Sequence, residues 1–196
     1  YTISNTFDPA NAQLTTLNLG TGAATLVGSP LSQDLKIMGM TCSPNGILYA
    51  VGQLDIGNDN FNSLYIIDRE TGLARLVGPT GVTDGRDTYF SGFLMALAFA
   101  PDGTLYGVNV STLFSIDIYT GEATKVFDFK DMTSAMVMGL AIDKDWNFYL
   151  SDWADSEGAI YALNVYTGSA TPILKTGLPN IHNIAFKAPG HTERQK

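Results

Sequence analysis

The fold is decided by residues 113–126, which read LFSIDIYTGEATKV. Apolar and polar residues alternate on both sides of Thr120-Gly121, which is the pattern of two half-buried strands joined by a tight turn. Glycine suits such a turn because it adopts a positive φ angle at no steric cost. The segment therefore predicts a β-hairpin.

This hairpin occurs four times along the chain. The Thr-Gly pairs with the same flanking pattern begin at Thr21, Thr71, Thr120 and Thr167, at intervals of 50 (71 − 21), 49 (120 − 71) and 47 (167 − 120) residues. A repeat of 20–50 residues is typical of solenoids and propellers, in which each repeat is one supersecondary unit. The chain is therefore expected to be a repeat protein.

A second hairpin lies between successive Thr-Gly turns. In residues 42–49 and 99–106 an apolar strand ends at Pro-Asn-Gly or Pro-Asp-Gly and is followed by Leu-Tyr, and residues 142–149 align with both. Such Pro- and Gly-containing steps are strong turn signals between hydrophobic runs. Each repeat thus holds four short antiparallel strands, and no helical period appears, so an all-β chain is predicted.

The strand count predicts a closed four-bladed β-propeller with four strands in each blade. The chain opens with a Leu-Tyr-type strand at 1–4 and ends with an apolar strand at 181–186. Pairing of these two strands would complete one blade, close the ring and hide its edges. The propeller is expected to cover residues 1–190, with a polar tail at 191–196. The alternatives are an open piece of a larger ring and half of an eight-bladed dimer, which the complementary termini disfavour.

Composition and charge exclude several functional classes. The 196 residues are 45% hydrophobic and 15% charged, and their net charge of −8 repels phosphate backbones, so nucleic-acid binding is not expected. No apolar run has the roughly 18 residues of a membrane-spanning helix, so membrane insertion is not expected. Cys42 lies in an apolar segment and is predicted to be buried. The first residue is Tyr1, and a cleaved signal peptide is one explanation, so we expect a secreted, periplasmic or extracellular protein.

Two motifs carry a family resemblance. The pattern Leu-Tyr-x-Ile-Asp-x-x-Thr-Gly-x-Ala-x-x-Val and the pattern Gly-Leu-Ala-Phe-x-Pro-Asp-Gly-Thr-Leu-Tyr resemble the repeats of bacterial extracytoplasmic β-propeller proteins of the NHL and YWTD-like groups. The resemblance covers residues 1–190 and implies the propeller fold. Relatives of the NHL type include binding scaffolds, lyases and metal-dependent lactonases, so no single chemistry is implied.

Four long loops, at 52–62, 78–92, 128–135 and 151–158, are expected on one face of the propeller, around the mouth of its channel. Three of them place an aromatic residue beside a charged one, which suits a sugar ring or a peptide segment. The alternative is that these are ordinary solvated loop charges. We therefore expect a monomeric binding module that takes a glycan or protein ligand at this face. The predicted ligand-binding residues are Asp59, Phe61, Arg86, Tyr89, Phe90, Asp152 and Trp153.

Metal binding and catalysis are the weaker hypotheses. The oxygen-rich loop at 55–60 suggests Ca²⁺ but lacks EF-hand spacing. Met38, Met95, Met138 and His182 occupy one equivalent position near the channel, where soft ligands would suit Cu⁺, although methionines also fill narrow gaps in cores. The enzymatic alternative is a metal-dependent hydrolase or lyase with carboxylates at the channel mouth. Because the chain has two histidines and no phosphate-binding glycine loop, we expect no cofactor and no catalysis.

Overall fold

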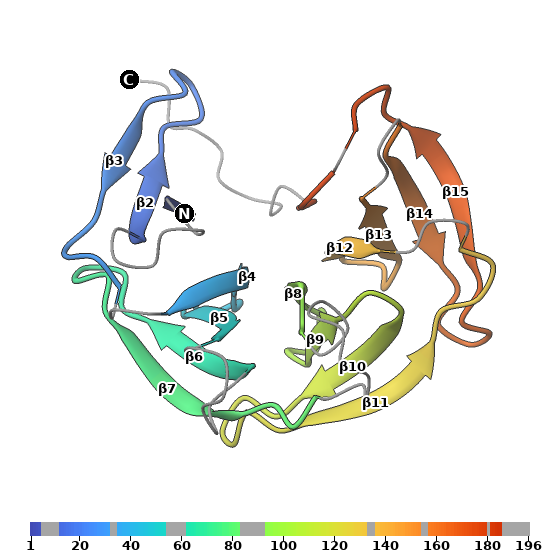
Figure 1. Ribbon diagram of the computed structural model, residues 1–196, viewed down its shortest axis with the longest axis horizontal. Helices are drawn as coiled ribbons and strands as arrows, with labels where there is room; N and C mark the ends of the chain where they lie inside the picture. The colour runs from blue at the N-terminus through green and yellow to red at the C-terminus, as the bar shows by residue number, and fades with distance from the viewer. Residues whose placement is uncertain are drawn as a thin grey trace.

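The computed structural model is all-β, with four antiparallel sheets arranged as the four blades of a propeller (Figure 1). It describes residues 1–4, 12–31, 35–53, 62–82, 93–132, 136–153, 157–179 and 181–185. Among these residues, no helix has the length and apolar character that crossing a membrane would require. The predicted fold class is confirmed.

Each blade is a meander of consecutive strands. The first sheet contains β1 (Thr2–Ser4), β2 (Gln13–Leu17) and β3 (Ala24–Leu26). The second contains β4 (Lys36–Cys42), β5 (Leu48–Gln53), β6 (Ser63–Ile67) and β7 (Ala74–Pro79). The third contains β8 (Ala96–Phe99), β9 (Leu105–Val108), β10 (Thr112–Ile116) and β11 (Ala123–Asp128). The fourth contains β12 (Val137–Ile142), β13 (Phe148–Asp152), β14 (Ala159–Leu163) and β15 (Ala170–Lys175).

Residues 181–185 belong to the segment predicted as the fourth strand of the first blade, and they lie next to β12 around the axis. A Cβ atom added to Gly39 of β4 would meet the Cα of Ala96 in β8 at 2.9 Å, and one added to Gly139 of β12 would meet the Cα of Asn183 at 3.1 Å. Residues 181–185 thus lie beside β12 as β8 lies beside β4. They are not assigned to a strand, and the described pairings do not include one with β1. Closure of the ring by that pair stays a prediction.

Clusters of aliphatic and aromatic side chains fill the interfaces between consecutive blades. Each cluster joins the facing sides of two neighbouring sheets: the first with the second, the second with the third, and the third with the fourth. The last residue of the strand before each Thr-Gly turn is buried only where a preceding blade covers it. Ile67, Ile116 and Leu163 face the preceding blade and are at most 7% exposed, whereas the equivalent Leu17 of the first blade is 46% exposed.

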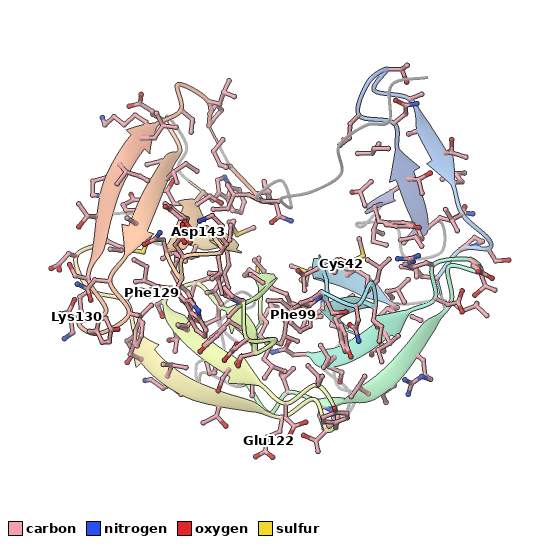
Figure 2. The ribbon with its side chains drawn as sticks, turned by 180° about the vertical axis from the view of Figure 1, so that it is seen from behind. Cys42, Phe99, Glu122, Phe129, Lys130 and Asp143 are labelled. Carbon is pink, nitrogen blue, oxygen red and sulfur yellow. The ribbon has the colours of Figure 1, made fainter. Side chains whose placement is uncertain are left out.

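The outer rim carries a second, polar connection between blades. The chain that leaves the outermost strand of one blade hydrogen-bonds to the Thr-Gly turn region of the next, and we call each such contact a rim latch. The latches are Ser29 N–H to Thr71 C=O (3.2 Å), Ala123 N–H to Thr80 C=O (2.9 Å) and Lys130 N–H to Gly168 C=O (2.7 Å). Lys130 lies on this rim in Figure 2, as does Glu122.

The four Thr-Gly turns share one hydrogen-bonding scheme. In the turn that ends at Gly72, the Asp68 carboxylate accepts the backbone N–H groups of Glu70 and Thr71, both at 2.8 Å. Asn18, Asp117 and Asn164 do the same in the other three turns. The glycines have φ angles between 73° and 85°, as the sequence predicts. The side chain before each turn therefore supplies the acceptor that holds the turn closed.

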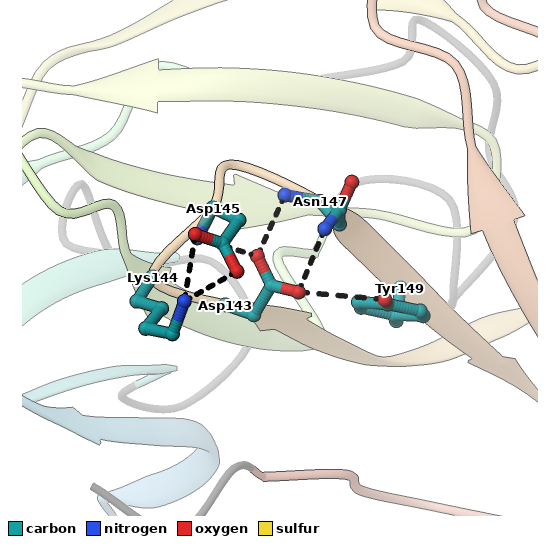
Figure 3. Close-up of polar contacts among 5 residues, drawn as sticks. All are labelled: Asp143, Lys144, Asp145, Asn147 and Tyr149. Atoms are coloured by element: carbon teal, nitrogen blue, oxygen red, sulfur yellow. Dashed lines mark hydrogen bonds and ion pairs between the residues drawn. The ribbon is translucent and has the colours of Figure 1, made fainter. Parts of the chain in front are cut away.

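The turn between β12 and β13 departs from the Pro-Gly pattern of its equivalents. Trp146 takes a φ angle of 64°, in the place where Gly46 and Gly103 have 86° and 88°. Figure 3 shows that Asp143 holds this turn: its carboxylate accepts the backbone N–H of Asn147 at 2.9 Å and the side-chain N–H of the same residue at 2.8 Å. These bonds support a non-glycine residue in the left-handed region.

The Asn147→Ala variant is expected to raise the pKa of Asp143 towards its ordinary value of 3.8. The side-chain hydrogen bond from Asn147 is the largest cause of the lowered pKa, followed by the backbone N–H of the same residue. Because the folded pKa is lowered, the carboxylate stabilises the folded chain above pH 3.8, and this stabilisation is lost as the pH falls through the folded pKa. An NMR titration of the Asp143 carboxyl carbon measures the shift. Tyr149→Phe, which removes the smallest of these causes, should move the pKa less, and the opposite ranking would contradict this account.

Candidate functional site

The innermost strands of the blades surround the axis of the propeller. β4 packs beside β8, and β8 packs beside β12. Each of them runs from the long loops at one end of the channel to a short turn at the other. The beginnings of these strands therefore line one end of the channel, and their last residues line the other. The two ends of the channel differ in chemistry.

An apolar cluster lies at the loop end of the channel. Phe93, Met95 and Met138 are buried in it, and Met38, Met136 and Trp153 pack against it. The predicted channel position thus does bring Met38, Met95 and Met138 together. The ring of His182 lies beside Trp153 of the same cluster, and the two ring centroids are 5.6 Å apart.

This cluster has the composition of a packed core. Methionine side chains fill irregular gaps, and sulfur–aromatic contacts are favourable. In the part of the chain that the structure describes, no group of three or more His, Cys, Asp or Glu side chains lies close enough to hold a metal ion. Methionine thioethers are also ligands of Cu⁺, so Cu⁺ binding at this position stays a hypothesis.

The predicted ligand-binding residues divide into two groups. Asp59, Phe61, Arg86, Tyr89 and Phe90, together with the Ca²⁺ loop at 55–60, lie outside the described residues. Asp152 and Trp153 lie at the end of β13 and just after it.

The Asp152 carboxylate is buried and already paired. It is 2% exposed, and it accepts the backbone N–H of Ala159 at 2.7 Å and the hydroxyl of Tyr161 at 2.9 Å. These bonds tie β13 to β14 at the point where the chain leaves the sheet. The arrangement gives Asp152 a structural role in the fourth blade.

A cavity of about 530 Å³ opens at the other end of the channel, near the short turns. Its lining repeats around the axis, because equivalent positions of successive innermost segments contribute to it. Met40, Leu97, Leu140 and Ile184 form one level, Thr41, Ala98, Ala141 and Ala185 the next, and Cys42, Phe99 and Ile142 the outermost. Figure 2 shows Cys42 and Phe99 near the centre of the arc of blades. Tyr1, Leu48 and Asn183 complete the lining.

The lining combines an apolar wall with a few neutral polar groups. Thr41, Asn183, Cys42 and Tyr1 are the side chains of the lining that offer hydrogen bonds, and Tyr1 and Phe99 add aromatic rings. Cys42 is exposed, so the prediction that it is buried is wrong. Its apolar neighbours line an open cavity and do not cover it. A volume in this range with scattered polar groups is typical of ligand sites.

The carboxylates with shifted pKa values, Asp68, Asp128 and Asp143, are not among the residues that line this cavity. Hydrogen bonds lower the pKa of each: from the backbone of Thr71 to Asp68, from the side chain of Lys125 to Asp128, and from the side chain of Asn147 to Asp143. All three groups hold turns or the rim. Their shifts report local structure, because hydrogen bonds to the charged form are what lower them.

Comparison with known proteins supports the fold alone. No protein-family model and no curated protein matches the sequence. Among solved structures, a chain of a nidogen–laminin complex superimposes with a TM-score of 0.63 at 12% identity, over 92% of this chain and 64% of that one. A calcium-binding regucalcin from Agrobacterium tumefaciens gives 0.55 at 18%, over 93% and 59%. A gluconolactonase from Xanthomonas campestris gives 0.54 at 13%, over 86% and 57%. The chain thus spans less than two thirds of each, and their functions range from protein complexes to catalysis.

Proposed function

We propose that this chain is a non-catalytic binding module and that its ligand is a segment of another protein held in the axial cavity. The observation that carries the proposal is the cavity itself, about 530 Å³ in volume and lined by apolar side chains of equivalent positions. Apolar walls with few polar groups favour aliphatic side chains and backbone amides over charged or polyhydroxylated ligands. The described lining carries no carboxylate or imidazole, which favours binding over acid–base chemistry.

The site proposed here lies at the opposite end of the channel from the long loops. Phe93, Met95 and Met138 pack together at the loop end, whereas the described cavity lies near the short turns. A protein ligand is favoured over a glycan because the described lining is mostly aliphatic and offers few hydrogen-bonding side chains to sugar hydroxyls, beside the aromatic rings of Tyr1 and Phe99. The nidogen–laminin complex is a precedent for this fold within a protein–protein complex.

A peptide-library selection tests this function. We expect the intact chain to enrich peptides from a random twelve-residue phage library, because the cavity has room for several side chains. Attachment of a bulky maleimide to Cys42, which lines the cavity, should reduce their binding tenfold or more. The measurement is fluorescence anisotropy of the enriched peptides with labelled and unlabelled protein.

The matched control carries the same label elsewhere. In Cys42→Ser/Glu122→Cys, the maleimide sits on the exposed rim and should leave peptide binding unchanged (Figure 2). Failure to enrich any peptide, or binding that ignores the label on Cys42, would contradict the proposal. Saturable binding on a glycan array in place of peptide binding would show that the ligand is a carbohydrate.

A further inference from the structure

Among the residues that the structure describes, no strand pairs with the inner edge of β1 in the first blade. Val27 N–H donates to Leu14 C=O at 2.8 Å, so the backbone groups of Leu14 point towards β3. The backbone groups of its neighbours Gln13 and Thr15 therefore point towards β1, where these residues pair with Ser4 and Thr2. Backbone directions alternate along a strand, so the N–H and C=O of Ile3 point away from β2, towards the axis.

This edge lies next to the cavity. Tyr1, two residues before Ile3, belongs to the cavity lining. Asn183, Ile184 and Ala185 also belong to it. In Figure 1 the amino-terminal strand and the end of the described chain lie on either side of the opening in the arc. Tyr1, beside β1, and residues 183–185, beside β12, thus line the same cavity.

The other three blades show what fills this position. Their innermost strands β4, β8 and β12 pair antiparallel with β5, β9 and β13. In each, large apolar side chains alternate with small ones: Met38-Gly39-Met40, Met95-Ala96-Leu97 and Met138-Gly139-Leu140. The small residue is required, because a Cβ on Gly39 or Gly139 would meet the next innermost segment at 2.9 or 3.1 Å.

The chain's own candidate departs from this template. Aligned with Met138-Gly139-Leu140, it reads His182-Asn183-Ile184, so a larger polar side chain replaces the small one. It lies beside Gly139 of β12, and Ser151 Oγ of β13 donates to Ile181 C=O at 3.2 Å. The position on β1 is thus left without a matching strand among the described residues.

We propose that the protein segment bound by this chain is an extended strand that adds to β1 as its fourth, innermost strand. It would run antiparallel to β1, pair with Ile3, and alternate methionine or leucine with glycine or alanine. When a strand adds to the edge of a sheet, main-chain hydrogen bonds provide the affinity, and pockets for every second side chain provide the specificity. This inference rests on the proposed function and specifies the conformation and sequence class of the ligand.

The test uses a synthetic peptide with the sequence of residues 136–144, MVMGLAIDK, labelled at its carboxyl end. Gly139 and the equivalent Gly39 pair with Ser151 and Val51, which correspond to Ile3 in the first blade. We expect saturable binding to the intact chain by fluorescence anisotropy. Sarcosine in place of the glycine removes one N–H and leaves the side chains unchanged, and it should weaken binding about tenfold, the effect of one backbone hydrogen bond.

Two sets of protein variants test the edge. Ile3→Pro removes the inward N–H, whereas Ile3→Ala truncates the same side chain and keeps that N–H, so Ile3→Pro should bind the peptide at least tenfold more weakly than Ile3→Ala. Circular dichroism compares the folding of the two variants. His182→Met/Asn183→Gly converts the chain's own segment to the template, and it should compete with the peptide and weaken its binding.

The outcomes separate the two proposals. If library peptides bind in a Cys42-dependent way but the sarcosine peptide and the Ile3→Pro variant bind as well as their controls, the strand model is overturned and the proposed function stands. Failure of the 136–144 peptide to bind, alongside successful library selection, also overturns the strand model. If neither peptide class binds, the proposed function fails.

Discussion

Gly121→Ala is expected to destabilise the folded chain by about 3 kcal/mol, because it adds steric overlap to an unfavourable backbone angle. Gly121 has a φ angle of 85°, which costs an alanine about 1–2 kcal/mol. A Cβ atom there would also press on the carbonyl oxygen of Gly78, in the chain that leaves the preceding blade. The second and third blades would have to separate at the rim. Urea denaturation, with the slope m checked for constancy, measures the change.

Gly22→Ala is the matched control. Gly22 has a φ angle of 73° in the equivalent turn of the first blade, but no described atom lies within 4 Å of the added Cβ. Its cost should therefore be the backbone term alone, about 1 kcal/mol. Equal destabilisation by both substitutions would show that the rim contact contributes nothing.

Asp152→Ala is expected to cost about 3 kcal/mol through unpaired buried donors. The substitution leaves the backbone N–H of Ala159 and the hydroxyl of Tyr161 without their acceptor. Hydrogen bonds to a charged group contribute about 1.5–3 kcal/mol each, and part of this is offset by the desolvation of the carboxylate. Thermal or urea unfolding measures the loss.

Tyr161→Phe isolates one of the two bonds. It removes the hydroxyl and keeps the ring in the cluster between the third and fourth blades, so about 1–2 kcal/mol is expected. In Asp152→Ala/Tyr161→Phe the two effects should not add, because the partners share one bond. Full additivity, or a stable Asp152→Ala variant with altered peptide binding, would instead place Asp152 in a binding site.

The repeat architecture could be predicted from the sequence because it depends on local signals. The Thr-Gly turns, the alternating strands and the apolar innermost strands each lie within a few residues, and the φ angles of Gly22, Gly72, Gly121 and Gly168 confirm the turns. The rim latches could not be predicted, since they join backbone groups of different repeats.

The site was predicted less well. Equivalent residues at the starts of the innermost strands correctly suggested the Met38, Met95 and Met138 cluster. The cavity was missed, although a signal was present: Met40, Leu97, Leu140 and Ile184 recur two residues further on. Whether such a ring closes the channel or leaves space depends on the separation of the blades. Cys42 was misplaced for the same reason.

The rim latches and the clusters between blades connect only neighbours in the chain. Stability in such an array is approximately a sum of the terms for each repeat and each junction, as in a one-dimensional Ising chain. The second and third blades have a described cluster on both sides, whereas the first and the fourth have one each, and residues 181–185 also lie against β12 of the fourth blade. Opening should therefore begin in β1–β3 as a separate foldon, while the middle blades stay protected. The blade to which we propose that a ligand strand adds is thus also the one expected to open first.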